Sequence, residues 1–132
     1  MGAWGHQFDE NDSALDWIAD FEAAPSWSQI SDVFEAVFAA DDADYVDLDD
    51  CSAALVAGEI VAAGLGQPSD RLVPSIVEWA KANSIGAIAL KADAIKSASL
   101  VKSESELSEL WKESDDAAAW TATVDDLLSR LI

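Results

Sequence analysis

The segment DCSAALVAGEIVAA, residues 50–63, determines the expected architecture. It consists almost entirely of alanine and branched aliphatic residues, so as a helix it would be apolar nearly all the way round. A helix with no polar face belongs in the interior of a bundle. The following sequence, Gly64-Leu65-Gly66-Gln67-Pro68, is typical of a helix end followed by a turn. We therefore predict a central, alanine-rich helix that other helices surround.

Helical periodicity continues on both sides of this segment. Ile30, Val33, Phe34, Val37 and Phe38 recur at i, i+3, i+4, i+7 and i+8, and an apolar stripe also follows residues 84–101. Ser26 with Gln29, and Ser103 with Glu106, have the spacing of capping boxes. Further helices are expected from about residue 12, with Leu15, Ile18 and Phe21 inward, and near Pro74, started by Ser69 or Asp70. Others are expected around Leu107, Leu110 and Trp111, and after Asp115 or Asp116. The sequence predicts an all-α fold, with six or seven helices in a single compact domain over residues 1–132.

The charge is large and unevenly distributed. The chain of 132 residues has 26 acids and 7 bases, a formal net charge of −19. Residues 1–70 contain 16 of the acids and no lysine or arginine. Such a surface repels nucleic acid and anionic membranes, because both require neutralising cations on the protein. It attracts a basic partner, although acidity that serves only solubility, or that is common to the proteins of the host, is the alternative.

The densest acidic stretch is residues 41–50, which we expect to connect the second and third helices. Its candidate partner-binding residues are Asp41, Asp42, Asp44, Asp47 and Asp49. The stretch lacks the glycine and the final glutamate of an EF-hand loop, so a dedicated calcium site is not expected. The alternative is a solvated loop that also caps the third helix.

Three residues are of types that can take part in a chemical site. Cys51 is the single cysteine, in apolar surroundings that suit a buried thiol, and His6 is the single histidine. A metal site needs three or four converging ligands, so His6 alone does not indicate one. Glu59 interrupts the apolar helix; it either marks a functional site, lies at an exposed edge, or pairs with a cation from the second half such as Arg71. No catalytic residue, cofactor or metal ligand is predicted.

Both ends of the chain resemble a known family. The opening Met1-Gly2-Ala3-Trp4-Gly5, the following Phe8-Asp9-Glu10-Asn11-Asp12, and the closing Ser105-Glu106-Leu107 and Leu110-Trp111-Lys112-Glu113 are similar to a family of small bacterial domains of unknown function. Gln7 and Glu10 depart from that pattern. The resemblance implies a single all-helical domain from a bacterium and no particular activity. Trp4, between two glycines, is expected to insert its indole into the core.

These observations favour a non-enzymatic interaction protein. An acidic binder of a basic protein, in the manner of an immunity protein or antitoxin, fits the charge best. The alternative is a small-ligand-binding protein or enzyme with a pocket between the helices, under the N-terminal segment. The start of the chain has no basic and apolar regions of a signal peptide, and no apolar run is long enough for a membrane span, so a cytoplasmic location is expected. The sequence does not predict an oligomeric state.

Overall fold

The structure, a computed structural model, describes residues 12–43, 48–103, 111–113 and 117–132. Its helices are α1 (Asp12–Ala23), α2 (Trp27–Ala43), α3 (Leu48–Gly64), α4 (Pro74–Ala82), α5 (Ser84–Ser103) and α7 (Ala117–Leu131). These ranges include no β-strand. The all-α prediction is confirmed.

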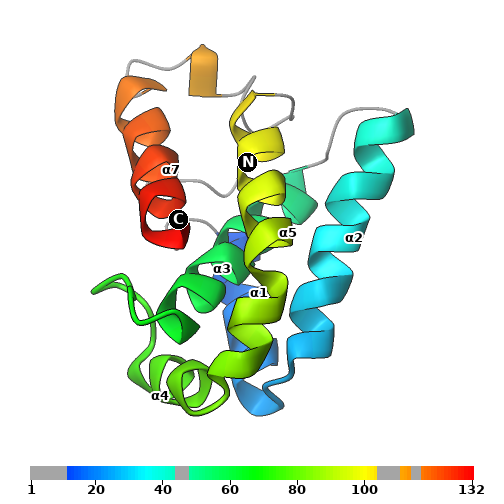
Figure 1. The fold of residues 1–132 in the computed structure, drawn as a ribbon. Coiled ribbons are helices and arrows are strands. Elements are labelled where there is room, and N and C mark those ends of the chain that lie inside the picture. The colour runs from blue at the N-terminus through cyan, green and yellow to red at the C-terminus, as the bar shows by residue number, and fades with distance from the viewer. Residues whose placement is uncertain (1–11, 44–47, 104–110, 114–116) are drawn as a thin grey trace.

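Helix α3 lies at the centre of the molecule. All residues from Cys51 to Gly64 are buried, which covers nearly four turns without a solvent-exposed position. Helices α1, α2, α4, α5 and α7 all pack against it (Figure 1). The expected central helix is thus confirmed, and it begins two residues before and ends one residue after the predicted 50–63 range.

Small residues allow the neighbouring helices to approach α3 closely. A Cβ atom built on Gly64 would lie 2.4 Å from the Cβ of Ala87 in α5 and 3.3 Å from the carbonyl oxygen of Ala80 in α4. On the opposite helix, a Cβ on Gly86 would lie 2.2 Å from Cδ1 of Trp27. Glycine is required at both positions by packing, because no side chain fits between the helices there.

Aromatic rings join α1, α2 and α4 at one end of the molecule. Trp17 stacks on Phe21 with ring centroids 5.2 Å apart, Phe21 meets Trp79 edge-on at 5.4 Å, and Trp79 lies 4.8 Å from Trp27. The indole Nε1 of Trp27 donates to the carbonyl of Asn83 at 3.0 Å. Such contacts stabilise beyond the area they bury, and the hydrogen bond satisfies the polar atom of a half-buried indole.

Several sequence predictions of detail are corrected. Leu15 is 44% exposed, because Ala14, Ile18 and Phe21 form the stripe that faces the core. The hydroxyl of Ser26 accepts the N–H of Ser28 rather than that of Gln29, whose side chain donates to the carbonyl of Ala24, so the reciprocal capping box is not formed.

The start of α4 differs from the prediction, and several predicted residues lie outside the described ranges. Pro74 is in the first turn of α4 as expected, but the preceding cap is Val73 rather than Ser69 or Asp70. Trp4, His6, Glu106, Leu107, Leu110, Asp115 and Asp116 lie outside the described residues. No helix in the described part of the chain is both long enough and apolar enough to cross a membrane.

The packing predicts opposite outcomes for alanine at two glycines of α3. Gly64→Ala should lower the free energy of unfolding by about 1–3 kcal/mol, because its Cβ would overlap the methyl of Ala87 and the backbone of α4. Gly58→Ala is the matched control. Its Cβ would meet only the flexible end of Leu127, at 3.1 Å, and alanine favours the helix by roughly 0.5–1 kcal/mol. Urea unfolding of both variants measures the difference; equal losses would contradict the described α3–α5 contact.

Candidate functional site

The predicted partner-binding aspartates are divided between two helices. Asp41 and Asp42 belong to the last turn of α2, and Asp49 belongs to the first turn of α3. Asp44 and Asp47 lie outside the described residues. The expected ten-residue connector is therefore wrong in its bounds, because only residues 44–47 separate the two helices. The alanines at positions 39, 40 and 43 are strong helix formers, and they favour the extension of α2 through Asp41 and Asp42.

These positions differ in their electrostatic environment. The C-terminal end of a helix carries a partial negative charge, so Asp41 and Asp42 lie where a carboxylate is unfavourable. The N-terminal end carries a partial positive charge, so Asp49 and Asp50 lie where a carboxylate is favourable. Asp49 has a second role: its Oδ1 accepts a hydrogen bond from the hydroxyl of Ser13 at 2.6 Å, which joins the start of α1 to the start of α3. Of the five candidates, Asp49 is thus engaged within the molecule.

The acidic surface is larger than the predicted cluster. Helix α1 exposes four acids, Asp12, Asp16, Asp20 and Glu22, and α2 exposes Asp32 and Glu35. None of these six acids forms an ion pair with a cation among the described residues. Helical spacing identifies this surface in the sequence, because the acids of α1 alternate with the stripe of Ala14, Ile18 and Phe21.

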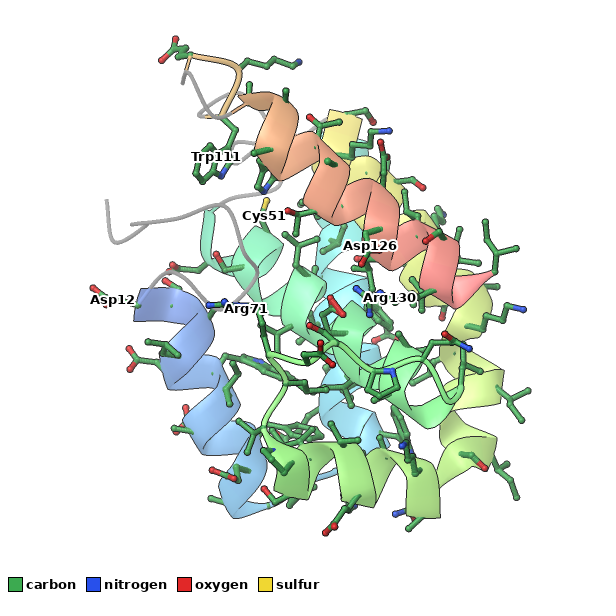
Figure 2. All side chains as sticks on the ribbon, turned by 90° about the vertical axis from the view of Figure 1, so that its left-hand side faces the viewer. Asp12, Cys51, Arg71, Trp111, Asp126 and Arg130 are labelled. Atoms are coloured by element: carbon green, nitrogen blue, oxygen red, sulfur yellow. The ribbon has the colours of Figure 1, made fainter. Side chains whose placement is uncertain are left out.

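Glu59 is the buried acid among the described residues. Its side chain is 3% exposed, and both carboxylate oxygens accept hydrogen bonds from Arg130, at 2.7 Å from Nη1 and 2.8 Å from Nη2. The same guanidinium donates from Nε to Asp126 at 2.8 Å and from Nη1 to the carbonyl of Gln67 at 3.2 Å. Arg130 therefore connects α3, α7 and the turn after α3 (Figure 2).

Glu59 pairs with a cation from the second half of the chain. The carboxylate is neither at an exposed edge nor without a cation, and the cation comes from Arg130 where Arg71 had been suggested. The hydrogen bond to Glu59 is the main cause that raises the pKa of Arg130 above its ordinary value; burial acts in the opposite direction. A bidentate pair of this kind fixes both the distance and the orientation of the two helices. The arrangement indicates a structural role for Glu59.

No group of three or more histidine, cysteine or acidic side chains arranged to hold a metal ion occurs within the described ranges. Cys51 is buried, as expected for a thiol in apolar surroundings.

The comparisons with known proteins complete the description. A family model described as a domain of unknown function, DUF4259, matches residues 2–123. The chain belongs to the DUF4259 family. The expected resemblance to a family of small domains of unknown function is thereby confirmed. The match ends inside α7, before Asp126 and Arg130. No curated protein matches the chain. No solved structure matches it either.

The Glu59–Arg130 pair gives a testable energetic pattern. Arg130→Met should lower the free energy of unfolding by roughly 3–5 kcal/mol, because it leaves a buried carboxylate without its cation. The double variant Glu59→Met, Arg130→Met should lose much less, because both charges are removed together. A double-mutant cycle by urea unfolding measures the coupling. Lys102→Met is the control, since its partner Asp125 is half exposed, and it should change stability by less than about 1 kcal/mol. Additive losses at Glu59 and Arg130 would contradict a coupled pair.

The two aspartates on either side of residues 44–47 should respond with opposite signs. Asp42→Asn should raise the free energy of unfolding by a few tenths of a kcal/mol to about 1, because it removes a charge from the negative end of α2. Asp49→Asn should lower it by roughly 1 kcal/mol, through the dipole of α3 and the bond to Ser13. Raising NaCl from near zero to about 0.2 M should shrink both effects and stabilise the wild type by relieving self-repulsion. Thermal unfolding at low and moderate salt tests this; equal signs for both variants would contradict it.

Proposed function

We propose that this DUF4259 protein is a non-enzymatic interaction protein that binds a basic protein, in the manner of an immunity protein or antitoxin of the bacterial cytoplasm. The observation that supports this most is the uncompensated charge of α1 and α2. Their exposed acids make no ion pair with any described cation, and residues 1–70 supply no lysine or arginine of their own. A surface of one sign steers the encounter with a partner of opposite charge.

The described ion pairs lie elsewhere and have structural roles. Lys102 pairs with Asp125 and Arg130 pairs with Glu59 and Asp126, which secures α7 to α5 and α3. The cations of the second half are thus partly used within the fold, whereas the acids of the first half with described side chains, other than Glu59 and the partly exposed Asp50, face solvent. This division supports recognition through the acidic first half of the chain, and we expect its densest part, residues 41–49, to contribute most.

A small-ligand-binding or enzymatic role with a pocket between the helices stays the alternative. Its expected location was under the N-terminal segment, and residues 1–11 lie outside the described residues.

The proposed partner can be sought directly. Immobilised protein incubated with a lysate of its own host should retain a basic protein that elutes as NaCl rises from about 0.1 to about 0.5 M. In stopped-flow experiments with that purified protein, the triple variant Asp42→Asn, Asp44→Asn, Asp47→Asn should associate roughly tenfold more slowly with little change in dissociation.

A matched variant separates local recognition from total charge. Asp16→Asn, Asp20→Asn, Asp32→Asn removes the same three charges from exposed positions of α1 and α2. A smaller effect of this variant supports recognition by residues 41–49. Equal slowing would contradict the special role of residues 41–49, and failure to retain any basic protein would contradict the proposal itself.

A further inference from the structure

Helix α5 exposes an apolar face that the proposed function does not use. Ile85 is 83% exposed and Ile88 is 64% exposed, although both are large aliphatic residues. Ala89 and Ala92 are exposed on the same side of the helix. We call these four residues the α5 face. These two adjacent turns have no exposed charge, which is unusual on a chain of net charge −19. Exposed apolar patches commonly mark interaction sites.

Lysines outnumber acids around the α5 face, although the exposed Asp93 directly follows Ala92. Lys81, in the last turn of α4, precedes Ile85 by four residues, and Lys91 follows Ile88 by three. Residues 74–103 contain four lysines and two acids, so this part of the chain has a net positive charge. The α5 face therefore suits an apolar partner surface bordered by carboxylates.

Helix α1 of the same protein presents such a surface. Leu15 is 44% exposed, and Ala19 and Ala23 follow it at i+4 and i+8 as exposed residues. Asp12, Asp16, Asp20 and Glu22 border this stripe, and Glu22 also accepts a hydrogen bond from the hydroxyl of Ser75 in α4 at 2.6 Å. We call Leu15, Ala19 and Ala23 the α1 face. Its two alanines leave space for the larger isoleucines of the α5 face, and helices pack at about 8–10 Å when side chains interdigitate in this way.

The two faces cannot meet within one molecule. Helices α1 and α5 both pack on α3 and lie on opposite sides of it, with α1 on the left and α5 on the right in Figure 2. The residues of α1 that are buried in the core are Ala14, Ile18 and Phe21, so the α1 face points away from the core. Contact between the faces requires two molecules.

We propose that the α5 face binds the α1 face of a second copy, head to tail. The contact pairs isoleucines with alanines and lysines with aspartates, and it competes with the basic partner proposed above for the acids of α1. Because the two faces differ, each added copy leaves one of each face free, so the association is open rather than a closed dimer.

Net charge sets the conditions for this association. Copies of net charge −19 repel one another over long distances at low salt. At about 0.2 M NaCl, screening limits electrostatics to roughly 7–10 Å, which leaves the close lysine–aspartate and apolar contacts while the long-range repulsion weakens. Association should therefore be weaker near zero salt than at about 0.2 M NaCl.

Sedimentation velocity of the purified protein at about 0.2 M NaCl, from micromolar to about 1 mM, tests the proposal. The weight-average mass should rise continuously with concentration beyond that of two copies. Ile88→Asp and Leu15→Asp should each remain monomeric, because each loses one face. The matched control is Ile132→Asp, an exposed isoleucine outside both faces at 84% exposure, which should associate like the wild type.

Mixing the two defective variants provides the sharpest result. An equimolar mixture of Ile88→Asp and Leu15→Asp keeps one intact α1 face and one intact α5 face, so it should form a dimer of the two and grow no further. Circular dichroism should show all three variants folded, since each replaced side chain is exposed. A wild type that stays monomeric at about 1 mM, a mixture that stays monomeric, or an equal loss for Ile132→Asp would each overturn the proposal.

Discussion

Burial of α3 on all sides is the constraint on which the rest of the structure depends. From Cys51 to Gly64 no position faces solvent, so every direction around the helix must be covered by another element. Close packing then limits what the covering helices can present: at Gly64 the neighbours α4 and α5 come so near that not even a methyl group fits.

The single carboxylate on this stretch of α3 determines where the end of the chain lies. Burying Glu59 without a cation would be costly, and Arg130 supplies one from α7 with both carboxylate oxygens engaged. One turn before Arg130 along α7, the side chain of Leu127 packs on Gly58. The polar pair and the glycine contact together select one orientation of α7 on α3, while the exposed acids of α1 and α2 have no comparable restraint from described cations.

The sequence is most informative where complete burial of a helix requires an almost entirely apolar segment. A run of fourteen nearly all-apolar residues has few uses other than a central helix, and its bounds were predicted to within two residues. Amphipathic stripes were predicted less accurately, because Leu15 and Ala14 are neighbours on α1 and either could complete the stripe with Ile18. The aspartates of residues 41–50 were expected in a loop, whereas α2 continues through Asp41 and Asp42; helix propensity disfavours aspartate by only about 0.7 kcal/mol or less, which tertiary packing overrides. Arg130 could not be chosen from seven cations, because it lies 71 residues from Glu59 and no spacing rule connects them.

Native-state hydrogen exchange tests the central position of α3 most directly. If α3 is covered on every side, the amides of residues 52–64 should exchange only through global unfolding and should be the slowest in the protein. The amides of α1 and of the exposed first turns of α5 should exchange faster, through local opening. Faster exchange in α3 than in α1 or α5 would contradict the account, because it would show that the central helix opens to water before the helices that cover it.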